Sequence, residues 1–148
     1  MKTEITLCFD FGNSRKKLAV FSNKKIIAER ILYTDTSGEI ETLLQEFKPQ
    51  KSILSSVINH NPGIEDTLKE KTHFHKLSVA TKLNFTAPVG KPETIGADRL
   101  AIAAAAVHFF PKKKQFGYWP WELHYLQFYK PAARVFRRRN FAGYANAF

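Results

Sequence analysis

Residues 3–33 read TEITLCFDFGNSRKKLAVFSNKKIIAERILY, and this stretch decides the fold class. Apolar and polar side chains alternate over residues 3–11, 17–22 and 25–33, which is typical of β-strands. Two turn clusters, Gly12-Asn13-Ser14 and Ser22-Asn23-Lys24, separate these segments and favour tight reversals of the chain. The sequence therefore predicts an antiparallel meander of three strands.

Helical patterns begin directly after the meander. Thr36 and Glu39 have the spacing of a capping box, and the helix they open carries an apolar face made of Ile40, Leu43, Leu44 and Phe47. Asn61 and Pro62 provide an N-cap and a first-turn proline for a second helix. We expect this second helix to end near residue 71.

The remaining patterns complete an α/β domain. Residues 51–58 and 74–79 have strand patterns, residues 82–94 form a loop with two prolines, and residues 95–110 form an alanine-rich helix. The order β-β-β-α-β-α-β-α suits a mixed sheet that is covered by helices. We therefore expect one α/β domain over residues 1–111.

The basic residues gather in the last quarter of the chain, which has 148 residues and a formal net charge of +10. Residues 1–111 hold 15 Lys and Arg against 12 Asp and Glu, a difference of +3. Residues 112–148 hold 8 against 1, a difference of +7, together with 11 of the 20 aromatic residues. Because composition changes so abruptly, the two parts require separate interpretations.

Several common classes of protein are excluded. The longest apolar stretch, residues 100–110, is too short to cross a bilayer, and the N-terminus lacks the pattern of a signal peptide. Cys8 is the only cysteine, so the chain cannot form an internal disulfide. We expect a cytoplasmic protein that has no membrane partner.

The turn after the first strand combines a carboxylate, hydrogen-bond donors and cations. Phosphoryl transfer needs donors around the phosphate oxygens and a carboxylate that holds hydrated magnesium. Gly12 allows the backbone to approach a phosphate closely, and Asp10 stands at a strand end where it can meet a metal-bound water. The alternative is a solvated hairpin turn. We predict a nucleotide-phosphate site made of Asp10, Phe11, Gly12, Asn13, Ser14, Arg15, Lys16 and Lys17.

A second candidate site opens the last predicted helix at Gly96, Ala97, Asp98 and Arg99. Asp98 stands in the first helical turn, where the helix dipole favours its ionised form and where it can accept a hydroxyl proton as a general base. The Arg99 guanidinium can bind a carboxylate through two hydrogen bonds. The alternative is an ordinary helix N-terminus with an exposed arginine.

Together the two motifs resemble those of type III pantothenate kinases. Residues 10–17 match the family's phosphate loop, D-x-G-N-[ST]-x-x-K. Residues 96–99 match its substrate motif, G-x-D-R, and follow the usual context at Pro92, Glu93 and Thr94. The resemblance covers roughly residues 1–113, including the strand end Ser55-Ser56-Val57.

The resemblance implies a fold, an activity and a set of partners. The fold is the ribonuclease-H-like domain of the acetate/sugar-kinase/actin superfamily, an α/β domain whose mixed sheet has three antiparallel strands and flanking helices. The activity is ATP-dependent phosphorylation of pantothenate, the first step of coenzyme A biosynthesis, with Mg²⁺ near Asp10 and a monovalent cation, K⁺ or NH₄⁺. Asp98 would take the proton of the pantothenate alcohol, and Arg99 would lie near the pantothenate carboxylate. The family works as a homodimer with the nucleotide between two such domains, and nucleic acid is not an expected partner.

One position departs from the family pattern. The family usually has a tyrosine three residues before the proline of the substrate motif, and this chain has Val89 there. The loop over residues 84–91 is also shorter. These departures leave open a related kinase that acts on another small alcohol.

Residues 112–148 lack the family's second phosphate motif and its glycine-rich segment. A run of adenines can encode Lys112, Lys113 and Lys114, and a one-nucleotide insertion is easy in such a run. When one nucleotide is removed there, the codons of Trp119 and Trp121 become glycine codons, and both missing motifs can be read in the new frame. We therefore interpret this basic, aromatic tail as out-of-frame translation, poorly folded or helical near residues 121–129. The chain as given should then have little kinase activity.

The alternative interpretation of the tail is a non-catalytic module that binds nucleic acid. Cationic side chains would contact phosphates, and aromatic side chains would stack on bases. Its contacts would be Tyr118, Trp119, Trp121, Tyr125, Arg137, Arg138 and Arg139.

Overall fold

The computed structural model describes residues 3–34, 36–83 and 95–110, and it describes the backbone of three strands within residues 115–136. The chain divides into two compact units, Met1–Ala80 with Gly96–Asp98, and Thr81–Ile95 with Arg99–Phe148. The predicted domain boundary between residues 111 and 112 stays a prediction.

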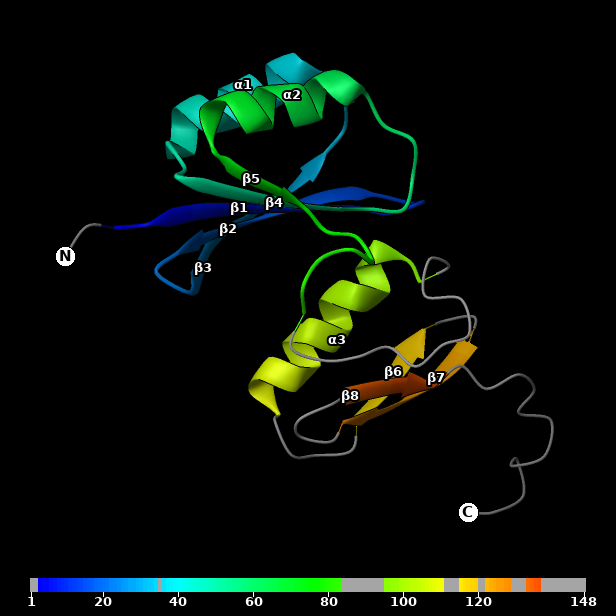
Figure 1. Cartoon of the computed structure of the whole chain (residues 1–148). Coiled ribbons are helices and arrows are strands. Elements are labelled where there is room, and N and C mark those ends of the chain that lie inside the picture. The colour runs from blue at the N-terminus through cyan, green and yellow to red at the C-terminus, as the bar shows by residue number, and fades with distance from the viewer. Residues whose placement is uncertain are drawn as a thin grey trace. The chain divides into compact units, whose positions relative to one another are not determined.

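The first unit is built on a five-stranded sheet with the strand order β3-β2-β1-β4-β5 (Figure 1). The strands are β1 (Ile5–Phe11), β2 (Lys16–Ser22), β3 (Lys25–Leu32), β4 (Lys51–Ser56) and β5 (His73–Lys76). The first three form the predicted antiparallel meander, whereas β4 pairs parallel with β1 and β5 pairs parallel with β4. The predicted mixed α/β sheet is confirmed.

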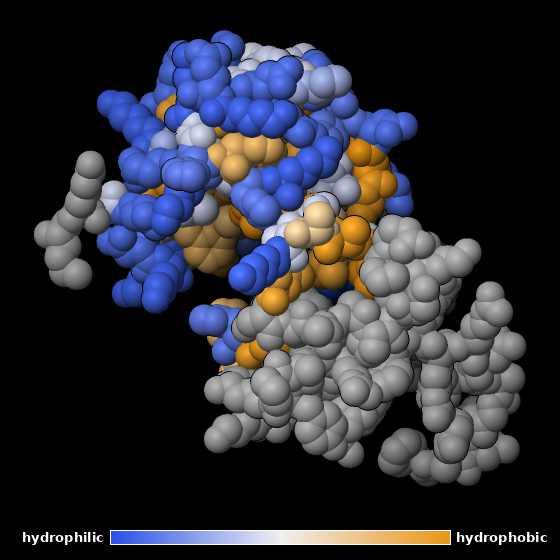
Figure 2. Space-filling model, viewed as in Figure 1, coloured by the Kyte–Doolittle hydropathy of each residue, from blue (hydrophilic) through white to orange (hydrophobic). Residues whose placement is uncertain are grey.

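Two helices, α1 (Ser37–Phe47) and α2 (Pro62–Lys71), lie together on one face of this sheet (Figure 1). Both begin at the predicted caps, since Thr36 Oγ1 accepts a hydrogen bond from Glu39 N (3.4 Å) and Asn61 Oδ1 accepts one from Gly63 N (2.9 Å). Hydrophilic side chains cover the outward surface of the two helices (Figure 2). The core beneath them includes Leu7, Phe9, Phe11, Leu18, Ile40, Leu54, Ile64 and Leu68.

Strand alternation decides which side chains the helices cover. Leu7, Phe9 and Phe11 of β1 lie in the core with α1 and α2, so Cys8 and Asp10 take the opposite face of the sheet. Complete burial of a side chain such as Phe11 stabilises the fold by about 1.5–3 kcal/mol. The apolar residues of β1 therefore hold Asp10 on the face away from the helices.

Two strands end earlier than the sequence predicts. β4 ends at Ser56 rather than at residue 58, because the Ser56 hydroxyl donates to Ile58 O (3.0 Å) and accepts from Ile58 N (3.4 Å). These two contacts turn the backbone out of the sheet. β5 ends at Lys76 rather than at residue 79, and most of the loop predicted over residues 82–94 lies outside the described residues.

The second unit contains most of α3 (Ala97–Phe109) and an antiparallel sheet with the order β6-β7-β8. Its strands are β6 (Gln115–Trp119), β7 (Glu122–Phe128) and β8 (Ala133–Phe136). The helix expected near residues 121–129 is wrong, because β7 occupies that stretch and its Tyr and Phe residues favour strand pairing. None of the described helices has the length and apolar character needed to span a membrane.

Candidate functional site

Asp10 lies on β1 between two cross-strand partners, Lys17 of β2 and Ser55 of β4. Residues that pair across strands share a face, so the three side chains lie on the face opposite α1 and α2. Because β1 and β4 run parallel, their carboxyl ends meet at one edge of the sheet. In open α/β sheets, ligands bind beyond the carboxyl ends of the strands, so this edge is the candidate site.

The turn between β1 and β2 leaves room for a ligand at Gly12. Gly12 N donates a hydrogen bond to Arg15 O (3.0 Å), which closes the hairpin. Gly12 has no positive φ, and among the described residues the nearest atom to a Cβ added there is Arg15 O at an ordinary 3.5 Å. The fold therefore tolerates a methyl group at this position, and the glycine has no side chain to hinder the approach of a phosphate.

Gly96 serves a different purpose at the start of α3. A Cβ at Gly96 would lie 2.5 Å from Asp98 Oδ1 and 3.4 Å from Val57 Cγ1. The glycine therefore allows the Asp98 carboxylate to fold back toward its own helix N-terminus. Val57 follows β4 directly, and its N–H donates to Phe11 O (3.0 Å), so this turn joins the Gly96–Asp98 segment to the ends of β1 and β4.

The electrostatics of Asp10 show that the two predicted motifs meet. Partial burial raises the pKa of the Asp10 carboxyl, the Lys17 ammonium lowers it, and the negative charge of Asp98 raises it again. The net effect is a pKa above the ordinary value of 3.8. The structure thus brings Asp10 and Asp98 together, although they are far apart in sequence.

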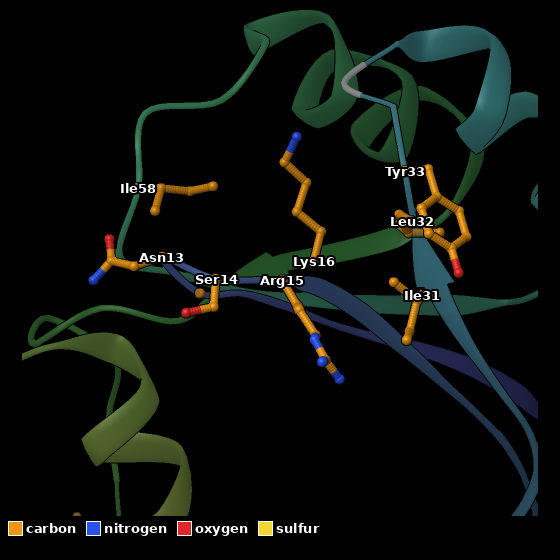
Figure 3. A pocket seen from close by; sticks show the side chains of 9 residues that line it. Asn13, Ser14, Arg15, Lys16, Ile31, Leu32, Tyr33 and Ile58 are labelled. Carbon is orange, nitrogen blue, oxygen red and sulfur yellow. The ribbon is translucent and has the colours of Figure 1, made fainter. Parts of the chain in front are cut away.

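Strand alternation divides the predicted phosphate loop between two faces. Asp10 and Lys17 lie on the Asp98 side, whereas Lys16 pairs with Phe11 and Leu32 and takes the α1/α2 side. Phe11 is completely buried, so only its backbone can reach a ligand. Figure 3 shows the Lys16 and Arg15 side chains leaving the hairpin in opposite directions.

A surface cavity of about 570 Å³ lies beside this hairpin (Figure 3). Arg15 and Lys16 bring positive charge to it, and Asn13 and Ser14 bring hydrogen-bond donors. The tip of the predicted phosphate loop therefore borders a space with the charge and polarity that a phosphate requires. The remaining lining residues are Gly12, Ile31, Leu32, Tyr33 and Ile58.

A polar network that sequence reasoning missed holds the turn after β4. The His60 ring contacts Ser56 Oγ through Nδ1 (3.0 Å) and Glu65 Oε1 through Nε2 (3.0 Å), and Lys76 Nζ donates to the same Glu65 oxygen (2.6 Å). Burial raises the pKa of Glu65, but the hydrogen bond and charge of Lys76 and the contact with His60 outweigh it, so the pKa falls below its ordinary value. The sequence places the acidic residue Glu65 in the first turn of a predicted helix, but it does not indicate that His60 and Lys76 bind its carboxylate.

The other predicted residues are not assigned to the first unit. Arg99 follows Asp98 on α3 and belongs to the second unit, while Val89 and the Pro92, Glu93 and Thr94 context lie outside the described residues. Within the described residues, no group of three or more His, Cys, Asp or Glu could hold a metal. Magnesium is commonly held by one or two carboxylates plus water and phosphate, so a site around Asp10 fits that metal better than zinc.

Comparisons with known proteins give a consistent result. A family model described as type III pantothenate kinase matches residues 6–116. A type III pantothenate kinase from Christiangramia forsetii is 35% identical over 111 residues, which are 74% of this chain and 46% of that protein. Another from Cytophaga hutchinsonii is 29% identical over 110 residues, which are 72% of this chain and 44% of that protein. The chain thus spans less than half the length of either relative.

Proposed function

Since this chain belongs to the type III pantothenate kinase family, we propose that the protein it represents phosphorylates pantothenate with ATP. This reaction is the first step of coenzyme A biosynthesis. The observation that carries the proposal is the meeting of Asp10 with Asp98 at the carboxyl ends of β1 and β4, since each comes from one of the two family motifs.

The proposed fold is the ribonuclease-H-like domain of the acetate/sugar-kinase/actin superfamily. The sheet order β3-β2-β1-β4-β5, with an antiparallel meander followed by parallel strands, supports it. In such a protein the nucleotide lies between two domains, and we propose a homodimer as the working form. Both statements extend the family resemblance to the whole protein.

The residues around Asp10 fit ATP and Mg²⁺. Gly12 has no side chain to hinder a phosphate, and the Asp10 carboxylate suits a magnesium-bound water. When bound, Mg²⁺ neutralises charge on the phosphate groups. Lys17 lies on the same face and adds a cation for the phosphates. We also propose that the protein uses a monovalent cation, K⁺ or NH₄⁺, and we assign no residue to its site.

We assign the general base to Asp98. Its carboxylate would accept the proton of the substrate's primary alcohol as the alcohol oxygen attacks the terminal phosphorus of ATP, whose bond to the bridging oxygen breaks so that ADP leaves. Asp98 lies in the first turn of α3, and only a deprotonated carboxylate can accept a proton. Arg99 would bind the carboxylate of pantothenate. Gly96 and Ala97 complete the proposed substrate segment, and Gly96 leaves the Asp98 carboxylate unobstructed.

The tail over residues 112–148 is proposed to be out-of-frame translation. The family match ends at residue 116, close to the three lysines, while both relatives are more than twice as long as their matched part. The alternative, a nucleic-acid-binding module, rests on the charge of this segment. Tyr118, Trp119 and Tyr125 lie on β6 and β7, whereas Trp121 and Arg137, Arg138 and Arg139 lie outside the described residues.

One experiment tests the proposal directly. The gene is sequenced across the codons of the three lysines, a protein is produced with one nucleotide removed there, and release of ADP is measured with pantothenate. We expect turnover that requires both pantothenate and Mg²⁺. Phosphorylation of a different small alcohol in place of pantothenate would support kinase activity but would reject pantothenate as the substrate. Val89, which stands where the family usually has a tyrosine, is the reason to test other alcohols. Absence of turnover with any small alcohol would reject the kinase.

A further inference from the structure

Ser55 carries a hydroxyl group that the fold buries and leaves unsatisfied. The residue is only 7% exposed, and its Oγ atom has no hydrogen-bond partner within the part of the chain that the structure describes. Buried polar groups almost always have partners, and a group without one weakens the folded state. Such an exception indicates either strain or a ligand that supplies the missing partner.

The other two serines of β4 differ from Ser55. Ser52 is 2% exposed, and its Oγ shares a hydrogen bond with Thr72 Oγ1 (2.6 Å). The Ser56 hydroxyl contacts Ile58 O (3.0 Å) and His60 Nδ1 (3.0 Å). Both belong to the face that α1 and α2 cover, and both have partners. Only the serine of this strand that takes the other face is left without one.

The position of Ser55 points to the kind of ligand. It pairs with Asp10 in the parallel register of β1 and β4, so the hydroxyl and the carboxylate share one face at one strand end. The Asp10 carboxylate and the Ser55 hydroxyl are oxygen groups, which suit the waters of a hydrated magnesium ion, and Lys17 on the other side of Asp10 adds a cation for a phosphate.

We propose that Ser55 is a positioning residue for hydrated magnesium: its Oγ accepts a hydrogen bond from a water molecule bound to the ion, beside Asp10. This inference rests on the proposed function, because Mg²⁺ arrives with ATP. Waters bound to Mg²⁺ are hydrogen-bond donors, and the ion keeps several of them when it binds to protein. A serine side chain can change rotamer at little cost when a ligand supplies a new hydrogen bond.

The proposal predicts opposite effects on stability and on ligand binding. Ser55→Ala removes the unsatisfied hydroxyl, so the ligand-free chain should melt at a higher temperature, by about 2–4 °C. The same change should weaken binding of Mg²⁺·ATP by about three- to tenfold, since one hydrogen bond to the hydrated ion is lost. A purely structural role cannot produce gains in stability together with losses in binding.

The experiment uses the full chain, its Ser55→Ala variant and a Ser52→Ala control. Ser52 is a buried serine on the same strand whose hydroxyl has a partner, so Ser52→Ala should melt lower and should leave Mg²⁺·ATP affinity unchanged. Melting is followed without ligand, and titrations with ATP are followed by the amide signal of Gly12, once with Mg²⁺ and once with a chelator. Without Mg²⁺, the unaltered chain and Ser55→Ala should bind ATP equally.

Each outcome decides the matter. A lower melting temperature for Ser55→Ala would show that the hydroxyl has a structural partner, and it would overturn the inference. Unchanged Mg²⁺·ATP binding, or an equal loss with and without Mg²⁺, would overturn it too and would leave the proposed kinase standing. If the unaltered chain does not bind ATP at all, the proposed nucleotide site is wrong, and the proposed role of Ser55 is then wrong as well.

Discussion

Asp98, at the N-terminus of α3, lies close enough to Asp10, at the end of β1, for its negative charge to raise the pKa of the Asp10 carboxyl. Two carboxylates of like charge in one place destabilise each other unless a cation or a proton lies between them. This arrangement therefore suits a site that receives a metal ion with its substrate. The effect of the Asp98 charge on the pKa of Asp10 can be measured in the ligand-free chain.

The first prediction concerns this pair. Asp98→Asn removes the negative charge next to Asp10, so the pKa of Asp10 should fall toward its ordinary value of 3.8. The measurement is a pH titration of the Asp10 carboxyl carbon by NMR. Asp66→Asn, a change to an exposed aspartate of α2, serves as the control and should leave this titration unchanged.

The same pKa has a consequence for stability. A carboxyl whose folded-state pKa is raised contributes stability that is fully present below its ordinary pKa of 3.8 and is lost as the pH rises through the folded-state value. Asp10→Asn lacks this titration. The unfolding free energy of the variant, relative to that of the unaltered chain, should therefore increase as the pH rises above 3.8. A difference that stays constant with pH would show that Asp10 is not perturbed.

The second prediction separates two glycines. Gly12→Ala meets no close contact, so the variant should fold with nearly unchanged melting temperature but should bind ATP more weakly, because its methyl group occupies the phosphate space. Gly96→Ala places a methyl group against the Asp98 carboxylate and should shift the Asp10 titration instead. Thermal melting, ATP titration and the NMR titration are measured for both. Destabilisation of Gly12→Ala by more than about 1 kcal/mol would contradict the ordinary contact expected for the added methyl group.

The third prediction concerns Glu65 in the network behind the site. Its pKa is lowered, so it contributes stability that is present above its ordinary value of 4.5 and is lost as the pH falls through the folded-state value. Glu65→Gln should therefore destabilise the chain at pH 7 and should have a smaller effect below pH 4, measured by denaturant unfolding. Glu70→Gln is the matched control on α2, because its partner Lys71 is exposed and such surface pairs contribute about 0–1 kcal/mol.

The fourth prediction concerns the proposed general base. In the protein with the corrected reading frame, Asp98→Asn should lower kcat by about 10²- to 10⁴-fold, because the amide cannot accept the alcohol proton. Binding of ATP should change much less, and steady-state kinetics with direct ATP titration would separate the two effects. The chain as given should show little pantothenate-dependent release of ADP. Near-normal kcat in Asp98→Asn, or robust turnover by the chain as given, would contradict these assignments.

The fifth prediction concerns the tail over residues 112–148, which carries a net charge of +7. If it is out-of-frame translation, it should bind nucleic acids only weakly and without sequence preference, and this binding should fall steeply with salt. Titrations of single-stranded and duplex DNA with the full chain and with residues 1–111 test this point. Tight, sequence-dependent binding that is lost on truncation would favour the nucleic-acid-binding module.

Local signals in the sequence were sufficient for most of the first unit. The caps at Thr36 and Asn61, the turn at Gly12-Asn13-Ser14 and the alternation along β1 each depend on residues that are close in sequence. Local signals were not sufficient for the tail. The sequence predicted a helix near residues 121–129, but the structure has strand β7 there, because pairing with β6 and β8 outweighs local helix propensity. The predicted phosphate site also included Phe11, whose side chain the structure buries in the core on the face away from Asp10.

By itself, the sequence determined the two motifs, the order of elements over residues 1–110 and the resemblance to the family, because each depends on residue types at short spacings. Only the tertiary structure decided that Asp10 meets Asp98, that Ser55 pairs with Asp10, and that Lys16 leaves the face of Lys17. The relationships between strand residues follow from strand register, and a slip of one residue would turn every side chain of a strand to the other face. Long-range packing of the core sets that register, so no local pattern can reveal which polar groups share a site.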